Sequence, residues 1–257
     1  MIDFHNHVLP NLDDGAKNFD VALAMIKKAY SEGTTHIVST VHFQHPQMLD
    51  INTDYKYLCS VAQELEKKAK EKNMPIKITP SAEVYFSTNL DELVDNPTVI
   101  LNQSYMLVEF SPQLLPHNLS EVIYKIQIKG ITPIIAHPER YRNIQRNYKI
   151  AKRWKEKDYI LQINAGSILG LSGPRIQKTA LTLLENGLCH LVGSDAHNQH
   201  KRPICLIDAY NFIEKKFDNE YVELLKENAE ILFNNKQIIN IKSRLKNESS
   251  FFGNLFK

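Results

Sequence analysis

Two pairs of potential metal ligands lie far apart in the chain and share the same spacing. His5 and His7 are separated by one residue, and so are Asp195 and His197. Side chains at positions i and i+2 point to the same side of a β-strand, so each pair can aim two donor groups into one site. Imidazole and carboxylate together form a ligand set for zinc, manganese or iron. Because each pair follows a short apolar run, the sequence predicts a metal site.

Further histidines and carboxylates follow other apolar segments that we expect to be strands. They lie at or near the ends of these segments, at His42, Glu83, Glu109 and His137. Barrel enzymes place their catalytic groups at the C-terminal ends of parallel strands, so we expect these residues to converge with the two pairs on one face. An ionised carboxylate among apolar residues is costly unless it is paired or bound to a metal. This favours metal ligation for Glu83 and Glu109.

The segments that must position these residues alternate between strand and helix. Helical periodicity and β-branched runs distinguish the two. We expect strands at 1–4, 35–41, 76–82, 105–110, 131–136, 159–163 and 188–192. We expect helices at 18–32, 54–72, 119–129, 147–157 and 177–186, with further helices to about residue 234. This alternation predicts a mainly parallel sheet covered by helices, and about seven strands favour a barrel over an open sheet.

The composition is that of an ordinary globular domain. The chain has 257 residues, of which 43% are hydrophobic and 23% are charged, with a net charge of +2. The length fits one large domain, and the small net charge implies no strong field for nucleic acid or membranes. No stretch is long and apolar enough to span a bilayer, and a cleaved signal peptide would remove the first histidine pair. We therefore expect a cytoplasmic protein that binds no nucleic acid and contacts membranes at most peripherally.

The cysteines do not support thiol chemistry. Cys59, Cys189 and Cys205 are odd in number and lack Cys-x-x-Cys spacing, so they predict no disulfide framework. Cysteine-dependent tyrosine phosphatases need Cys-x5-Arg, in which the loop cradles the phosphate around a thiolate. The residues at the corresponding positions are Leu65, Asp195 and Asn211. A phosphocysteine mechanism is therefore excluded, and we expect the cysteines to be small buried hydrophobic residues.

Several longer motifs occur in a characteristic order. In chain order they are MIDFHNHVLPNLDDGAKN, SAEVYF, LVEFS, IIAHPERYRN and LVGSDAHN followed by Arg202-Pro203. Together they resemble the polymerase and histidinol phosphatase (PHP) superfamily of metal phosphoesterases. Within it they are most similar to the bacterial tyrosine-phosphatase branch, the regulators of capsule and exopolysaccharide synthesis. The resemblance extends from residue 1 to about residue 205, and the spacing between the motifs also fits.

The resemblance implies an α/β fold, a distorted TIM-like (β/α)7 barrel in a single domain that we place at residues 1–242. It also implies two or three divalent cations, manganese first, with iron or zinc as alternatives. One cation would bind His5, His7, Glu83 and Asp195, and a second would share Glu83 with Glu109 and His137. A third would bind Asp14, His42 and His197. From its neighbours alone, Asp14 is an ordinary turn residue, so its ligand role rests on the resemblance.

Two arginines follow candidate ligands closely. Arg140 lies just beyond His137, and Arg202 lies just beyond the Asp195–His197 pair. A guanidinium binds phosphate oxygens with two parallel hydrogen bonds, although a surface salt bridge is the commoner role of arginine. Given the resemblance, we expect both to act as catalytic phosphate-binding residues. His45 could also line the site, but a plain loop position is the favoured interpretation.

The resemblance implies a metal-dependent protein-tyrosine phosphatase. Its substrate would be a phosphotyrosine protein, a membrane-associated bacterial tyrosine kinase that controls capsule or exopolysaccharide synthesis. Two alternatives stay open, a small-molecule phosphatase acting for example on histidinol phosphate and a noncatalytic metal-binding regulatory domain. Residues 243–257 are expected to be a flexible C-terminal tail, with a docking segment for a partner or an anionic membrane as the alternative.

Overall fold

The computed structural model describes residues 1–48 and 50–234. In this part of the chain a seven-stranded sheet runs in chain order from β1 to β7, and every neighbouring pair of strands is parallel. The strands are β1 (Ile2–Asn6), β2 (His36–Phe43), β3 (Lys77–Tyr85), β4 (Tyr105–Glu109), β5 (Thr132–Ala136), β6 (Ile160–Asn164) and β7 (Leu191–Gly193).

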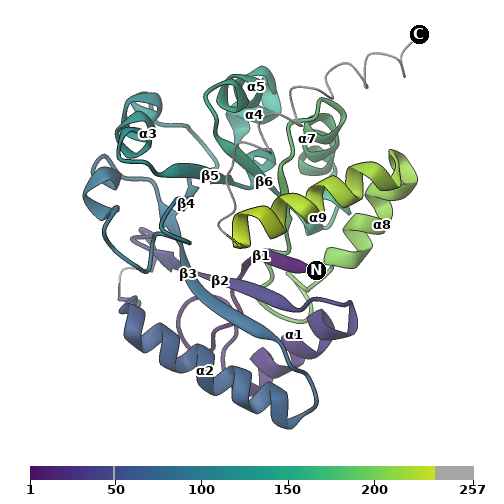
Figure 1. The fold of residues 1–257 in the computed structure, drawn as a ribbon. Coiled ribbons are helices and arrows are strands. Elements are labelled where there is room, and N and C mark those ends of the chain that lie inside the picture. The colour runs from purple at the N-terminus through teal and green to yellow at the C-terminus, as the bar shows by residue number, and fades with distance from the viewer. Residues whose placement is uncertain (49, 235–257) are drawn as a thin grey trace.

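The last strand returns to the first and nearly closes the sheet into a barrel (Figure 1). Asn6, the last residue of β1, and Ala196, just beyond β7, form an isolated parallel bridge. The amide of His7 donates to the carbonyl of Ala196 at 3.0 Å, and the amide of Asp195 donates to the carbonyl of His5 at 2.7 Å. These bonds join the two predicted ligand pairs directly. The predicted distorted (β/α)7 barrel is confirmed.

Helices surround the curved sheet (Figure 1). The longer ones are α1 (Phe19–Ser31), α2 (Tyr55–Glu71), α3 (Leu119–Ile128), α5 (Lys149–Glu156), α7 (Pro174–Glu185), α8 (Leu206–Lys216) and α9 (Asn219–Phe233). Side-chain caps begin several of them, since Asn18, Asp54 and Asp218 accept from backbone amides in the first turn. The predicted order of strands and helices is confirmed.

Four short helices were not predicted. They are η1 (Leu90–Leu93), η2 (Pro138–Arg140), α4 (Arg142–Arg146) and α6 (Ala165–Ile168). They lie in the connections that follow β3, β5 and β6, where the chain leaves the C-terminal end of a strand. They are too short for hydrophobic periodicity to reveal them. Two of them place residues of the candidate site, because Arg140 ends η2 and α6 begins directly after Asn164.

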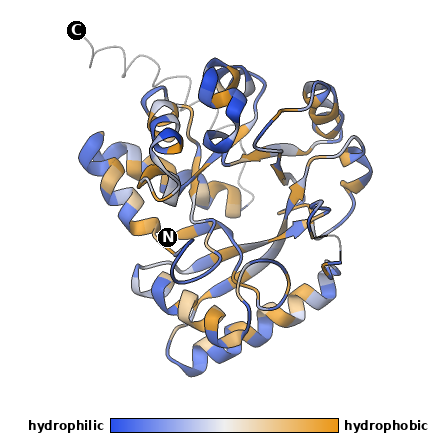
Figure 2. Cartoon of the chain, turned by 180° about the vertical axis from the view of Figure 1, so that it is seen from behind, coloured by the Kyte–Doolittle hydropathy of each residue, from blue (hydrophilic) through white to orange (hydrophobic). Residues whose placement is uncertain are grey.

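Both faces of the sheet are buried, which explains the apolar runs of the parallel strands. In β2, Ile37 and Val41 pack in one cluster with Leu58 and Leu65 of α2, while Val38 belongs to a second, larger cluster. Figure 2 shows the same division in the helices, whose hydrophobic sides turn towards the sheet and whose hydrophilic sides face outwards. The polar residues at the strand ends therefore stand out against an apolar framework.

The predicted tail at 243–257 and the domain end at residue 242 lie outside the described residues, so both stay predictions. Where the structure describes the chain, none of its helices combines the length and the apolar character needed to cross a membrane.

Candidate active site

Four candidate ligands from three strands meet at the C-terminal end of the barrel. The Nε2 atoms of His5 and His7 lie 3.3 Å apart. Nε2 of His5 is 3.2 Å from Oε2 of Glu83 and 3.4 Å from Oδ1 of Asp195. The matching distances for His7 are 3.4 and 3.5 Å. We call these four buried residues the inner group, and their donor atoms are close enough to share one metal ion.

A second set of donors lies nearer to solvent. Asp14 has a side chain that is 49% exposed, and its Oδ1 lies 3.3 Å from Nε2 of His42 and 3.0 Å from Nε2 of His197. The ring of His7 lies against that of His197, with their centroids 3.9 Å apart. We call His7, Asp14, His42 and His197 the outer group, since their donor atoms again lie within reach of one ion. The turn that carries Asp14 is thus also part of the cluster.

A third set surrounds two carboxylates. Nε2 of His137 lies 2.8 Å from Oε1 of Glu83 and 3.6 Å from Oε1 of Glu109. Nδ1 of His42 lies 3.4 Å from Oε2 of Glu83 and 3.8 Å from Oε2 of Glu109. We call these four residues the carboxylate group. His42, Glu83 and Glu109 present donors within common reach, so His42 stands between the second and third ligand sets that the resemblance implies.

The arrangement of these side chains fits divalent cations. Nδ1 of His42 and Oε2 of Glu109 are both buried and have no hydrogen-bond partner among the described residues. Burial, and then the neighbouring charge of Glu83, raises the pKa of Glu109 to about 9. An unpaired buried carboxylate is unfavourable, and a cation between these atoms would satisfy both. Nitrogen and oxygen donors without a thiolate suit manganese, iron or zinc.

The pKa shifts of the other candidate ligands also fit a bound cation. Burial would raise the pKa of Asp195, but the Arg202 guanidinium and His5 outweigh it and hold that pKa well below its usual value. Burial lowers the pKa of His137 to about 4. Burial also disfavours the charged form of His5, but the charges of Glu83 and Asp195 raise its pKa. Metal ions displace protons from their ligands, so a bound cation would take the place of protons on these side chains.

The backbone is unusual at two of these positions. His137 has φ 33° and Asp195 has φ 51°, both in the left-handed region that residues other than glycine rarely occupy. His137 also precedes Pro138, which disfavours helical conformations at the residue before it. Such conformations persist where the surrounding structure enforces them, and they gather at functional sites.

Asp13 holds the outer and inner groups together, although the sequence analysis assigned it no role. Its Oδ2 lies 2.7 Å from Nδ1 of His7 and accepts from the amide of His42 at 3.2 Å. Its Oδ1 accepts from the amide of Gly15 at 2.9 Å. A Cβ on Gly15 would overlap the carbonyl oxygen of His7, so only glycine fits there. The adjacent aspartates at 13 and 14 were the signal that both could serve the site.

Strand β6 supplies none of the predicted ligands but connects two of them. Oε1 of Gln162 lies 2.8 Å from Nδ1 of His5, and Nε2 of Gln162 donates to Oδ1 of Asn164 at 2.9 Å. Nδ2 of Asn164 then donates to Oδ2 of Asp195 at 2.6 Å. These bonds fix a histidine of β1 relative to the aspartate that follows β7. Two polar residues at alternate positions of an otherwise apolar strand were the overlooked signal.

Both predicted phosphate-binding arginines lie at this site. Nη1 of Arg140 is 3.3 Å from Oδ2 of Asp195, and Nη2 of Arg202 is 2.6 Å from Oδ1 of the same carboxylate. Nη1 of Arg202 is also 3.7 Å from Oδ2 of Asp14. The two guanidinium groups line a common pocket of about 240 Å³ next to the inner group. The structure therefore places two guanidinium groups beside the cluster of candidate metal ligands.

Known proteins are similar to this chain in sequence and in fold. The family model described as capsular polysaccharide synthesis, CpsB/CapC, matches residues 1–234. The chain belongs to the CpsB/CapC family. This confirms the resemblance to the capsule-regulating branch.

Two named tyrosine-protein phosphatases are similar to this chain over most of its length. Tyrosine-protein phosphatase YwqE of Bacillus subtilis is 33% identical over 244 residues, which cover 93% of each chain. Tyrosine-protein phosphatase CpsB of Streptococcus agalactiae serotype III is 32% identical over 249 residues, covering 93% of this chain and all of that protein.

A solved structure also matches closely. It is one of the crystal structures of YwqE from Bacillus subtilis and CpsB from Streptococcus pneumoniae, which are described as metal-dependent tyrosine phosphatases. It superposes with a TM-score of 0.87 at 32% identity, covering 93% of this chain and 96% of the other. A β-aspartyl dipeptidase from Fervidobacterium islandicum, with a TM-score of 0.54 and 13% identity, shares the fold alone.

His45 of this CpsB/CapC family member lies beside the site, although a plain loop position was favoured. It does lie in a loop, but its ring centroid is 5.0 Å from that of His42 and 5.1 Å from that of Tyr85. Its Nε2 is 4.0 Å from Oε2 of Glu109. The chain turns directly after β2, where Gln44 has φ 56°, and brings the ring back over the carboxylate group, which spacing alone could not reveal.

The cysteines of the family member lie apart from these groups. Cys189 and Cys205 are buried, and Cys59 is partly buried. Burial raises the pKa of the Cys205 thiol to about 12 and raises that of Cys189 as well. A thiolate nucleophile at neutral pH is therefore unfavourable at both buried positions.

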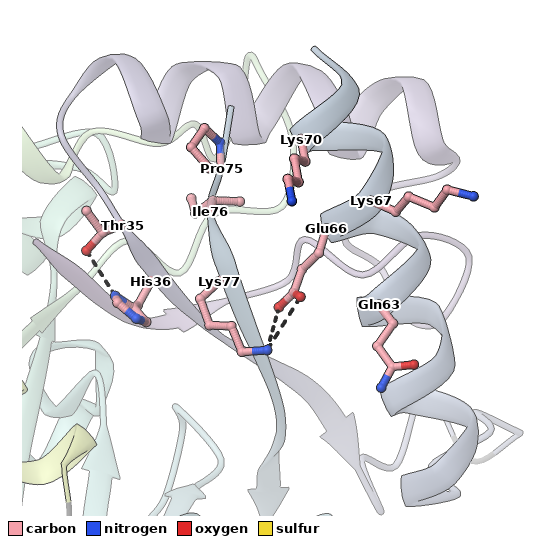
Figure 3. A pocket seen from close by; sticks show the side chains of 9 residues that line it. All are labelled: Thr35, His36, Gln63, Glu66, Lys67, Lys70, Pro75, Ile76 and Lys77. Atoms are coloured by element: carbon pink, nitrogen blue, oxygen red, sulfur yellow. Dashed lines mark hydrogen bonds and ion pairs between the residues drawn. The ribbon is translucent and has the colours of Figure 1, made fainter. Parts of the chain in front are cut away.

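A second hollow of about 660 Å³ lies at the other end of the barrel, between α2 and the first residues of β2 and β3. Figure 3 shows that its lining includes His36, Lys67, Lys70 and a pair formed by Glu66 and Lys77. Nζ of Lys77 lies 3.2 Å from Oε1 of Glu66. The candidate ligands and both site arginines all lie elsewhere, so the larger hollow is not the candidate active site of this family member.

Proposed function

We propose that this chain is a metal-dependent protein-tyrosine phosphatase. The observation that carries the proposal is the convergence of the inner, outer and carboxylate groups beside Arg140 and Arg202. Membership of the CpsB/CapC family supports it, since the relatives YwqE and CpsB are tyrosine-protein phosphatases.

The three groups would hold two or three divalent cations, with manganese first and iron or zinc as alternatives. The proposed ligands are His5, His7, Asp14, His42, Glu83, Glu109, His137, Asp195 and His197. Once bound, the cations would polarise the phosphoryl oxygens and lower the pKa of water towards neutrality. The cluster of buried donors and the unsatisfied atoms of His42 and Glu109 support this assignment.

The residues of the chain bind and orient the phosphate. Arg140 and Arg202 approach Asp195 from its two oxygens, which leaves their other N–H groups to donate to the nonbridging phosphate oxygens. Asp13 and Gln162 fix the rings of His7 and His5, so that their Nε2 atoms stay directed into the inner group. Tyrosine has a pKa of about 10 and leaves more readily than a serine alkoxide, so a strong general acid is less necessary.

The physiological substrate that we propose is phosphotyrosine on a membrane-associated bacterial tyrosine kinase that controls capsule or exopolysaccharide synthesis. The description of the family as one of capsular polysaccharide synthesis supports this. The partly exposed side chains of Asp14 and Arg202 support a site that a protein can reach from solvent. We place the reaction in the cytoplasm and the barrel domain at residues 1–242, with 243–257 as its tail.

The proposal is tested by comparing two substrates. The protein is chelated, reloaded with manganese, and supplied with either a phosphotyrosine peptide or histidinol phosphate. We expect a kcat/KM for the peptide at least about tenfold higher. A preference for histidinol phosphate would instead indicate a small-molecule phosphatase, and no turnover of either substrate would indicate a noncatalytic domain.

A further inference from the structure

The pocket beside the two arginines also has apolar lining residues that the phosphate chemistry does not use. Its volume is about 240 Å³. Besides Arg140, Arg202 and Asp195, its lining includes Leu171 and Ile176 around the loop that joins α6 to α7, and Pro203 from the loop after β7. Charged and apolar residues thus share one small pocket. A ligand with an anionic end and an apolar end would match both.

Leu171 is an exposed leucine on a firmly held turn. It is 58% exposed, yet its amide donates to the carbonyl of Gly166 at 2.8 Å. The turn continues with a bond from the amide of Gly173 to the carbonyl of Gly170 at 3.0 Å. Both of these glycines have positive φ, 83° at Gly170 and 96° at Gly173, which side-chain-bearing residues rarely adopt.

A side chain of α7 also holds the turn in place. Nε2 of Gln177 donates to the carbonyl of Ile168 at 3.0 Å, and the Gln177 side chain lies directly under Gly170. A single exposed leucine is ordinary on a protein surface. The backbone of Leu171 is held in a fixed position at the rim of a pocket with two arginines, so little backbone entropy is lost when the residue contacts a ligand.

The size of the pocket and its apolar lining residues favour a phosphate ester with a ring over one without. Pockets for drug-sized ligands span about 300–1,000 Å³, so this one suits a single side chain better than a large metabolite. A phenyl ring is apolar and flat and gains from burial against aliphatic side chains. Phosphoserine and phosphothreonine have no ring to place against Leu171.

We propose that Leu171, with Ile176 and Pro203, forms the binding wall for the phenyl ring of phosphotyrosine. This inference rests on the proposed phosphatase function and adds the residues that determine tyrosine specificity. The phosphate lies between Arg140 and Arg202, and the ring extends towards Leu171. Leu171 is a specificity residue, which contacts the leaving group and leaves the phosphate contacts unchanged.

The test measures preference for a ring, separately from turnover. The manganese-loaded protein is titrated by calorimetry with phenylphosphonate and with methylphosphonate, which differ in the ring. Two variants, Leu171→Ser and Leu171→Met, are compared with Ile128→Ser. Ile128 is 66% exposed at the end of α3, and that helix leads to the start of β5, away from the site. Turnover of a phosphotyrosine peptide by the unmodified protein and by Leu171→Ser is measured in parallel.

We expect the unmodified protein to prefer phenylphosphonate by at least about fivefold, from burial of a modest apolar area. Leu171→Ser should reduce this preference to within about twofold. It should lower kcat/KM for the peptide by about the same factor as it lowers the preference, and it should leave the affinity for methylphosphonate unchanged. Leu171→Met and Ile128→Ser should keep the preference.

Two results would overturn the inference in different ways. If the unmodified protein hydrolyses the peptide but Leu171→Ser keeps the full ring preference, the binding wall is wrong and the proposed function stands. If the unmodified protein fails to hydrolyse the peptide, the proposed function fails and this inference fails with it.

Discussion

Oδ2 of Asp13 lies 2.7 Å from Nδ1 of His7, and the opposite nitrogen of that ring points to Glu83 and Asp195. The Asp13 side chain is 1% exposed and also accepts from the amide of His42. A carboxylate on the far nitrogen of a ligating histidine fixes the tautomer and the direction of the ring. Asp13 therefore controls how His7 faces the candidate metal site.

Replacing this carboxylate should weaken metal binding. In Asp13→Asn the side-chain amide can turn its NH2 group towards His7, and an NH2 group cannot accept a hydrogen bond from Nδ1. His7 then loses the partner that fixes its tautomer and direction, so we expect manganese affinity or kcat to fall by about 10- to 100-fold. Manganese titration and steady-state kinetics measure the two effects. The control is Asp20→Asn, which changes an exposed aspartate in the first turn of α1. Unchanged metal affinity and kcat in Asp13→Asn would show that Asp13 does not orient His7 for metal binding.

The two arginines should not be replaceable by lysine. Lysine keeps the charge but loses the planar pair of donors, so Arg140→Lys and Arg202→Lys should each lower kcat/KM by about tenfold or more. Inhibition by inorganic phosphate should weaken in parallel, because phosphate needs the same donors. Arg153→Lys, in an exposed position of α5, serves as the control. Kinetics equal to those of the unmodified protein in both site variants would contradict the phosphate-binding role.

Much of the barrel could be predicted because its strands are buried on both faces. Ile37 to Val41 is apolar or β-branched almost throughout, and His42 follows at the strand end where barrel enzymes carry their ligands. The strand before Asp195 was expected at 188–192 but is Leu191–Gly193, because His190 and Cys189 form side-chain bonds at its start. The position of a strand end thus depended on contacts from other strands.

The supporting residues of the site could not be predicted in the same way. Gln162 acts on His5, 157 positions earlier in the chain, and Asn164 acts on Asp195. Glutamine and asparagine side chains can donate and accept hydrogen bonds, so their residue types do not identify their partners. Only the closed barrel shows which side chains they contact. Gly193 belongs to the same set, since a Cβ there would lie 2.7 Å from Cβ of His5 and 2.9 Å from Nε2 of Gln162.

The cysteines should be dispensable for the chemistry. We expect Cys59, Cys189 and Cys205 replaced together by alanine to leave kcat within about twofold, because buried thiols with raised pKa values supply no nucleophile. The free energy of unfolding should fall by roughly 1–2 kcal/mol for each of the two buried sites through lost packing. Denaturant unfolding separates the two effects. A large selective loss of kcat in a folded triple variant would contradict this prediction.

His190 should make the fold sensitive to acid. Burial, and then the charge of Lys155, lowers the pKa of His190 to about 3, while the unfolded chain has a histidine pKa of about 6.5. Below about pH 6.5 the unfolded chain therefore binds a proton that the folded chain excludes. The stabilisation is complete above that pH and is lost as the pH falls towards 3, by about 2 kcal/mol at pH 5.

The variant His190→Asn isolates this effect. Its side-chain oxygen can accept from the amide of Leu161, as Nδ1 of His190 does at 3.0 Å, but it does not titrate. We expect a smaller loss of stability between pH 7 and pH 5 in urea unfolding than in the unmodified protein. His117→Asn changes an exposed histidine and should keep the original slope. An equal slope in His190→Asn and the unmodified protein would show that His190 is not the group responsible.

The central claim is that the clustered histidines and carboxylates hold the metal ions required for phosphotyrosine hydrolysis. The most direct measurement is the rate of hydrolysis of a phosphotyrosine peptide by chelated protein, before and after manganese is added, in the unmodified protein and in His7→Ala and Asp195→Ala. We predict that chelation abolishes the rate and manganese restores it. Both variants should stay folded by circular dichroism, with kcat lowered by orders of magnitude even with manganese. Full activity in the metal-free protein would contradict the claim.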